Sequence, residues 1–180
     1  MLNKLLVSAA ALGAAFAVPA AADDSVVPPL ATFSGGIGVH AAPAGPIRGV
    51  AAAGAIWVID SLEARVAVNG HITVKGKGLV FGNTNNAGRT TGNFVAATFQ
   101  CDNTNTAAQF STPGQKVKLS PTGDFKIDDM LTPVPTAPCA SPMLLIRNGG
   151  SATSTTLGGW FAVGILDATT PSHGDEDDSD

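Results

Sequence analysis

The chain has 180 residues, a formal net charge of −4 and only 13% charged residues. Much of the acidic excess lies in residues 175–180. The charge of the part expected to fold follows no pattern and gives no support for a nucleic-acid partner, which would call for a basic stripe or patch. The chain is rich in Gly, Ala, Thr, Asn and Pro and has no tyrosine, a composition typical of short strands and many turns.

Residues 1–22 have the pattern of a secretory signal peptide. Lys4 supplies a basic start, residues 5–18 form an apolar run, and Pro19 and three alanines provide a cleavage site before Asp23. The run is too short to span a bilayer comfortably, although an uncleaved anchor is the alternative interpretation. We therefore predict a secreted protein, extracellular or periplasmic, with no membrane span after the signal is removed.

Three segments are expected after the signal peptide. Residues 23–32 are a Pro-rich extended lead-in, residues 33–168 form one β domain, and residues 169–180 form a disordered acidic tail. The tail lacks the Gly and the terminal Glu of a calcium-binding loop, which favours a solvated tail over a calcium site.

A first strand is predicted over Phe33–Val39, followed by a clear hairpin. Apolar and polar residues alternate over residues 62–68 and 72–75, and Asn69-Gly70 is a turn signal. A two-residue loop would mix the two faces, so we predict the three-residue loop 68–70 with a left-handed glycine. The expected register pairs Val66 with Ile72, Ala64 with Val74 and Glu63 with Lys75.

Six further strands are predicted along the chain: Phe94–Cys101, Gln109–Thr112, Lys116–Leu119, Phe125–Ile127, Met143–Arg147 and Trp160–Leu166. We expect Lys116–Leu119 and Phe125–Ile127 to form a second hairpin around Pro121-Thr122-Gly123. Met143–Arg147 is almost continuously apolar, which indicates a central strand buried on both faces or a strand near a barrel seam. In the last strand, alternation assigns the core face to Phe161, Val163 and Ile165.

These elements predict an all-β fold: an antiparallel β-sandwich or Greek-key barrel of about seven to nine short strands. The pattern does not give the strand connectivity. Cys101 and Cys139 are the only cysteines, and in an exported chain they most simply form one disulfide. Closing this loop would stabilise the fold by about 3–4 kcal/mol on the chain-entropy model.

Four blocks of the sequence together resemble a known group of proteins. The blocks are WVIDSLEARVAVNGHITVKGKGLVF, PTGDFKIDD, PCASPMLLIRN and GGWFAVGIL. They are similar to uncharacterised secreted bacterial all-β proteins, which carry one Cys pair and a closing Trp-containing strand. The resemblance spans most of the mature chain, but it implies no activity and transfers no functional residue.

Candidate catalytic and metal-binding residues are few. The histidines, His40, His71 and His173, have no spacing typical of a zinc site and are interpreted as solvated loop residues. Asp128-Asp129 and the Asp60/Glu63 pair are the only conceivable acid/base pairs. Asp128 and Asp129 would point to opposite faces of a strand. We therefore predict no enzymatic activity, no cofactor and no metal.

The two tryptophans are the one feature that suggests a ligand. Strand alternation places Trp57 with Glu63 and Arg65, and Trp160 with Ala162 and Gly164, which puts both rings on outer faces. Exposed aromatic rings are how sugar-binding sandwiches stack on pyranose rings. The interpretation that we favour is that a bend or bulge turns one or both rings inward, or that a loop covers them.

The leading hypothesis is a secreted, non-enzymatic extracellular or cell-envelope protein with a structural, adhesive or assembly role, acting by self-association. The alternative is a carbohydrate-binding module that stacks a cell-surface polysaccharide on Trp57 or Trp160. An enzyme of unrecognised type is the third possibility. Concentration-dependent association would favour the first hypothesis, and a change of tryptophan fluorescence on adding polysaccharide would favour the second.

Overall fold

The structure is a computed structural model, and it describes residues 27–113 and 116–168. The predicted signal peptide (1–22) and acidic tail (169–180), with His173, lie outside the described residues. The described part is built from strands and one short 3-10 turn, Thr84–Asn86, and contains no α-helix. The predicted all-β class is therefore confirmed.

Eleven strands make up the described chain: β1 Pro29–Gly38, β2 Trp57–Val58, β3 Ser61–Ala67, β4 His71–Lys77, β5 Val80–Phe81, β6 Phe94–Gln100, β7 Phe110–Ser111, β8 Val117–Lys118, β9 Phe125–Met130, β10 Met143–Asn148 and β11 Trp160–Leu166. The first strand begins at Pro29, so it includes the last residues of the expected lead-in. The last strand has the predicted bounds.

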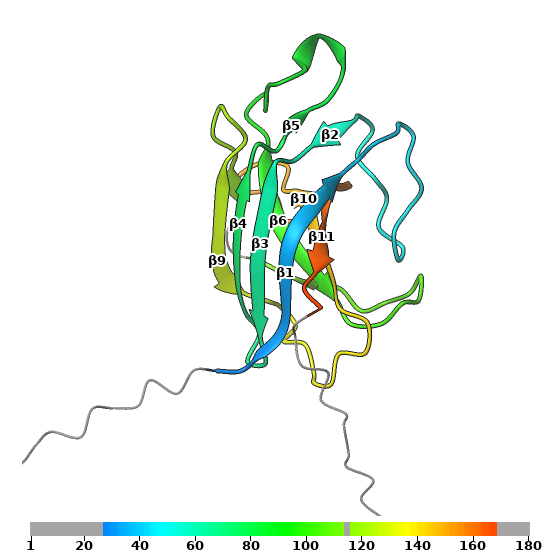
Figure 1. The fold of residues 1–180 in the computed structure, drawn as a ribbon, viewed down its shortest axis with the longest axis vertical. Coiled ribbons are helices and arrows are strands. Elements are labelled where there is room, and N and C mark those ends of the chain that lie inside the picture. The colour runs from blue at the N-terminus through cyan, green and yellow to red at the C-terminus, as the bar shows by residue number, and fades with distance from the viewer. Residues whose placement is uncertain (1–26, 114–115, 169–180) are drawn as a thin grey trace, which may run out of the picture.

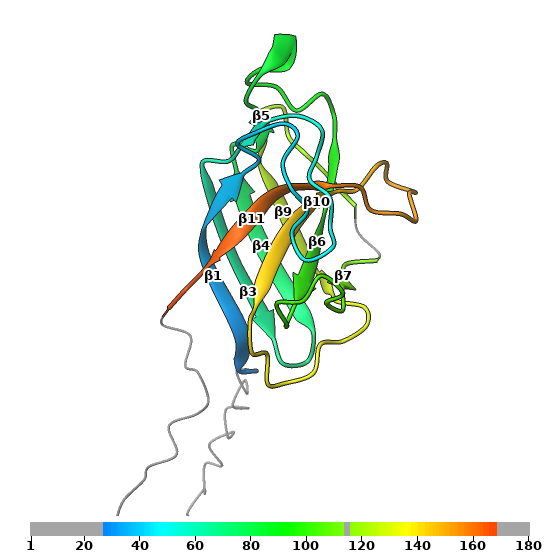
Figure 2. The same cartoon turned by 90° about the vertical axis from the view of Figure 1, so that its right-hand side faces the viewer.

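Most strands belong to one antiparallel sheet that curls into a nearly closed barrel (Figures 1 and 2). Its order is β7-β6-β10-β11-β1-β3-β4-β9, and β8 pairs with β6 next to β7. The two ends of the sheet meet where Ser111 and Thr132 exchange backbone hydrogen bonds of 3.0 and 2.8 Å. The short strands β2 and β5 form a separate pair near one end of the barrel.

The β3–β4 hairpin has the predicted register. Val66 lies opposite Ile72 and Glu63 opposite Lys75. Gly70 has a φ of 84°, and its N–H donates to the Ala67 carbonyl at 2.9 Å, which closes the three-residue loop. The loop was predictable over a two-residue loop because the latter would have placed Arg65 opposite Val74 and mixed the two faces.

The second predicted hairpin is wrong in its strand partners. β8 pairs with β6, and β9 pairs with β4. The turn itself forms, since the Ser120 N–H donates to the Asp124 carbonyl at 3.0 Å. It is also tied to the end of β4, because the Leu79 N–H donates to the Gly123 carbonyl at 3.0 Å. This long-range contact places β9 beside β4, and strand alternation carries no information about it.

The barrel interior is filled by aromatic and aliphatic side chains. Phe33 and Phe99 meet edge to face, with ring centroids 6.3 Å apart. β10 lies between β6 and β11, and Leu144, Leu145 and Ile146 are all 0% exposed. The prediction of a central strand buried on both faces is confirmed. The outward-facing residues of β10 are buried by a second layer of chain, described below.

The predicted core face of β11 is wrong at Val163 and Ile165, whereas Phe161 is buried as predicted, at 2% exposure. Ala162 lies opposite the inward Ile146, and a Cβ placed on Gly164 would lie 3.1 Å from Phe33 Cδ1. The small residues therefore face the interior, because the rings of neighbouring strands already fill that space. Val163 and Ile165 face outward, and Ile165 is 44% exposed.

Candidate functional site

Trp57 is buried, in agreement with the favoured interpretation and against a place on an outer face. Its side chain is 1% exposed and packs between Phe81 and Phe161, with ring centroids 4.1 and 4.0 Å away. The Trp57 N–H donates to the Val39 carbonyl at 3.0 Å. This bond holds β2 beside Val39, the residue that directly follows β1. The alternation of β3 does not extend back to Trp57, because β2 pairs with β5 in a separate sheet.

Trp160 is also buried, at 6% exposure, for a different reason. The register of β10 and β11 shifts between Ile146 and Arg147, so Trp160 lies opposite Arg147 in the outward-facing row. The Ala53 N–H donates to the Trp160 carbonyl, and the Trp160 N–H donates to the Ala51 carbonyl, both at 2.9 Å. A bulge and a neighbouring segment thus remove this ring from solvent.

Neither tryptophan offers a ring face on which a sugar could stack. The favoured interpretation from the sequence, a bulge or a covering loop, describes both environments. The sugar-stacking hypothesis depended on exposed indole rings and loses that basis at Trp57 and at Trp160.

Residues 39–56, here called the cover segment, cross the outside of β6 and β10 (Figure 2). The tip of the segment is a two-residue turn in which Ile47 and Val50 exchange backbone hydrogen bonds of 2.9 Å. At this turn Arg48 donates to the Ser141 carbonyl at 2.6 Å and to the Ser141 hydroxyl at 2.8 Å. Burial lowers the pKa of the Arg48 guanidinium from its ordinary value, and nearby Asp102 opposes this shift.

The predicted disulfide between Cys101 and Cys139 is confirmed, with Cα atoms 4.7 Å apart. The Ser141 N–H donates to the Cys101 carbonyl at 2.8 Å, so the disulfide and the Arg48 contact lie next to each other. The bond is consistent with an oxidising extracellular or periplasmic location.

Two buried polar atoms lie on the outward row of the covered strands. Gln100 Nε2 donates to the Arg48 carbonyl at 3.1 Å, but Gln100 Oε1 has no hydrogen-bond partner among the described residues. Trp160 Nε1 is likewise buried without a partner in the described part of the chain.

One cluster of titratable side chains lies on the outer face of the barrel. His71 Nε2 lies 2.9 Å from Asp128 Oδ1, and Lys126 Nζ lies 3.1 Å from Asp128 Oδ2. Hydrogen bonds from Lys126 first, and then from His71, lower the pKa of Asp128. His71 begins β4 and has this carboxylate partner, so its interpretation as a solvated loop residue is corrected.

The other conceivable acid/base residues do not converge. Asp128 and Asp129 are consecutive in β9, and one Asp129 oxygen accepts the Met130 N–H at 2.8 Å. Asp60 precedes β3. The ion pairs found among the described residues join Asp128 to His71 and to Lys126, and neither of them involves Glu63. His40 is exposed.

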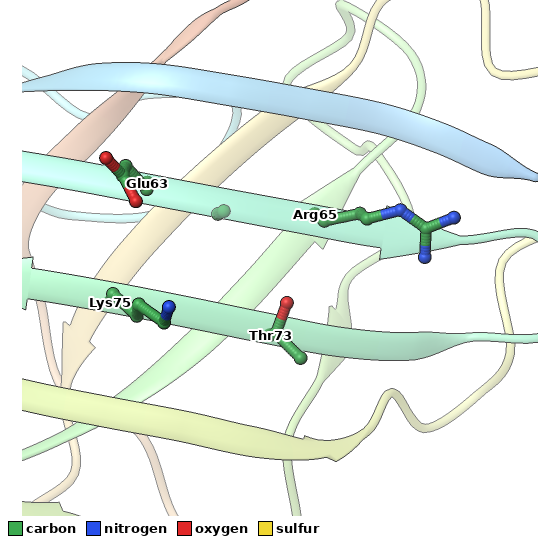
Figure 3. Close-up of a pocket in the computed structure, with 5 residues that line it drawn as sticks. Glu63, Arg65, Thr73 and Lys75 are labelled. Atoms are coloured by element: carbon green, nitrogen blue, oxygen red, sulfur yellow. The ribbon is translucent and has the colours of Figure 1, made fainter.

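A shallow hollow of about 200 Å³ lies on the outer face of β3 and β4 (Figure 3). Its polar lining residues are Glu63, Arg65, Thr73 and Lys75. Arg65 extends along β3 away from Glu63 and donates to the Val27 carbonyl. Charges of both signs line this open surface, and their side chains do not point toward one position.

A second hollow, of about 310 Å³, lies near the end of the barrel where Trp57 packs. Its lining consists of Ala52, Ala53, Gly54, Ala55, Trp57, Phe81, Asn93, Asn148, Gly159 and Phe161. Asn93 Nδ2 already donates to the Thr90 carbonyl at 2.8 Å, and Asn148 Oδ1 accepts the Gly150 N–H at 2.8 Å. None of the lining residues titrates.

The outer face of β1 and β11 carries an apolar cluster, here called the aliphatic patch, that consists of Ile37, Val163 and Ile165. Ile37 lies opposite Val163 and is 45% exposed. Ile165 lies over Gly35, since a Cβ on that glycine would be 3.2 Å from Ile165 Cδ1. The sequence interpretation missed this patch because it assigned Val163 and Ile165 to the core. The residues of β11 alone carry no signal for this face, because the choice depends on the interior space that Phe33 and Leu144 already occupy.

Within residues 27–113 and 116–168, no group of three or more His, Cys, Asp or Glu side chains is placed to hold a metal ion. The same residues contain no helix that is long and apolar enough to cross a membrane. No protein-family model, curated protein or solved structure matches this chain. Membership of the group of secreted proteins that it resembles stays a prediction.

Proposed function

We propose that this is a secreted, non-enzymatic protein of the cell envelope or extracellular space that acts through its surface by self-association. The aliphatic patch is the observation that carries the proposal. Ile37 and Ile165 are nearly half exposed on paired strands. Contiguous apolar surface rimmed by polar residues marks interaction sites in soluble proteins.

The contrast with the rest of the barrel supports this assignment. Most outward residues of β3, β4 and β9 are charged or polar, for example Glu63, Lys75 and Lys126. The patch therefore differs in character from the outer face of these three strands. It also lies on two strands that are paired on both sides, which gives it a rigid shape. The disulfide and the signal-peptide pattern of residues 1–22 support export.

Sedimentation velocity over a wide range of protein concentration tests the proposal. We expect the average mass of the wild-type protein to rise with concentration. The double variant Ile37→Thr/Ile165→Thr should remain monomeric, because threonine keeps the strand conformation and removes apolar surface. Val134→Thr is the matched control, since Val134 is 50% exposed outside the patch. A wild-type protein that stays monomeric throughout would refute self-association.

A further inference from the structure

We propose that the Cys101–Cys139 disulfide latches the cover segment, and that its reduction uncovers the outward face of β6, β10 and β11. In the oxidised protein this face is hidden. Thr98, Gln100 and Leu145 belong to outward rows of the barrel, yet each is 0% exposed. The corresponding rows of β3, β4 and β9 are open to solvent.

A continuous set of contacts joins the disulfide to the cover segment. Cys101 accepts the Ser141 N–H at 2.8 Å, and Ser141 in turn accepts both hydrogen bonds from the Arg48 side chain. Gln100, next to Cys101 in the chain, donates to the Arg48 carbonyl at 3.1 Å. The disulfide holds residues 139–141 against the end of β6, and this position supplies the partner that Arg48 binds.

The backbone conformation of Arg48 indicates that the contacts of its side chain stabilise the turn. Arg48 and Gly49 have φ values of 46° and 79°, as a type I′ turn requires. Asparagine and glycine favour this turn, whereas arginine is strained in it. Such strain persists where surrounding contacts over-determine the conformation. Here those contacts are the two hydrogen bonds to Ser141.

Besides the Arg48 side chain, the cover segment is held mainly by backbone hydrogen bonds, several of them to β11, and by the bond from Gln100. Its sequence from residue 41 to residue 55, AAPAGPIRGVAAAGA, is made mostly of alanine, glycine and proline, which bury little apolar surface. Val39 and Val50 are the residues of the segment that are fully buried hydrophobics. Segments with few buried contacts open at low free energy. Opening would also return Gln100 Oε1 and Trp160 Nε1 to solvent.

The chemical step is thiol–disulfide exchange with a dithiol. One thiolate of the reductant attacks a sulfur of the disulfide, and its second thiol resolves the mixed disulfide. Two electrons and two protons pass to Cys101 and Cys139, which become two thiols, while the reductant becomes a disulfide. Residues 139–141 are then free to move from β6, and Arg48 loses its partner.

Hydrogen exchange on the oxidised and the dithiothreitol-treated full chain tests the latch. The amides of Ala53 and Trp160 bond between the cover segment and β11, so they report its closure. We expect reduction to speed their exchange at least about tenfold, while Ile72 and Val74 in the paired strand β4 keep their protection. Equal acceleration at all four amides would mean general unfolding, and no change at Ala53 and Trp160 would mean no latch. Either result overturns the proposal.

Arg48→Asn separates the latch from other effects of the disulfide. Asparagine relaxes the turn but cannot make the two bonds to Ser141, so the oxidised variant should show the fast exchange of the reduced protein. Reduction should then add little, because both changes release the same contact. Arg89→Asn, at an exposed arginine outside the cover segment, is the control and should behave as wild type. Independent, multiplying effects of Arg48→Asn and reduction would overturn the proposal.

Discussion

Gly123 and Gly88 show how one backbone conformation is required for two different reasons. Both are left-handed, with φ values of 86° and 74°. A Cβ on Gly123 would lie 2.5 Å from the Leu79 backbone nitrogen, whereas a Cβ on Gly88 would meet no atom within 4 Å. Gly88 is thus needed for its φ alone, and Gly123 also for the close approach of the 120–124 turn to the chain after β4.

Alanine at these two positions should therefore have unequal effects. We expect Gly88→Ala to lower the free energy of unfolding by about 1–2 kcal/mol, the cost of a left-handed residue. Gly123→Ala should cost about 1–3 kcal/mol more, because the turn must also move away from Leu79. Urea unfolding of both variants measures the difference. Equal losses would show that the turn shifts freely.

Asp128 gives a prediction about charge. Lys126 and His71 lower its pKa in the folded protein, so it favours folding above its unfolded pKa and loses that contribution as pH falls through its folded pKa. Replacing Lys126 with methionine should raise the pKa of Asp128 toward the ordinary value. An NMR titration of the Asp128 carboxyl carbon measures this, and Lys118→Met, an exposed lysine on β8, should leave it unchanged. A pKa unaffected by Lys126→Met would contradict the assignment.

At the scale of the element, β11 shows where strand alternation misleads. Its larger residues suggest an inward Val163 and Ile165, but the interior already holds Phe33 and Leu144, whose atoms lie within about 3.2 Å of a Cβ on Gly164. The choice of face depends on the volume left by strands far away in the chain. It therefore follows from packing and not from the hydrophobicity of β11 itself.

Two substitutions test this assignment. Gly164→Val should destabilise the fold by about 1–3 kcal/mol through overpacking of the interior. Ile165→Ser should change stability by less, because nearly half of this side chain is exposed on the outer face. Thermal unfolding at low protein concentration, where association does not contribute, measures both. The reverse order of effects would restore the assignment made from sequence.

Local signals in the sequence were sufficient where neighbours in the chain pair with each other. The β3–β4 register followed from alternation and from Asn69-Gly70, and the disulfide followed from a single pair of cysteines. The partners of β8 and β9 and the burial of Trp57 depend on contacts between distant segments. The aliphatic patch was missed for the same reason, since it follows from which face of β11 the core leaves outside.

At the scale of the whole molecule, one covalent bond ties the chain between β9 and β10 to the end of β6. Cys101 and Cys139 are 38 residues apart, so the disulfide limits the unfolded chain over a long loop. It also fixes residues on which the cover segment depends. The bond therefore contributes to global stability as well as to the closure of one face.

Removing the disulfide should separate these contributions. We expect Cys101→Ser/Cys139→Ser to lower the free energy of unfolding by about 3–4 kcal/mol on the chain-entropy model. Guanidinium unfolding of the oxidised wild type and the double variant measures this loss, and reduced wild type should match the variant. A loss of about 1 kcal/mol or less would mean that the unfolded chain is little restricted by the bond.

The bridge between Ser111 and Thr132 has a consequence for how copies of this protein meet. Because it joins the two ends of the sheet, and β8 lies close to β9, neither terminal strand presents a long open row of backbone groups to a neighbouring molecule. Strand-by-strand growth into fibrils is thereby disfavoured. Contact through the aliphatic patch alone would join two copies about a twofold axis, a closed arrangement that uses the same surface of both copies. The expected assembly is a discrete pair rather than a polymer.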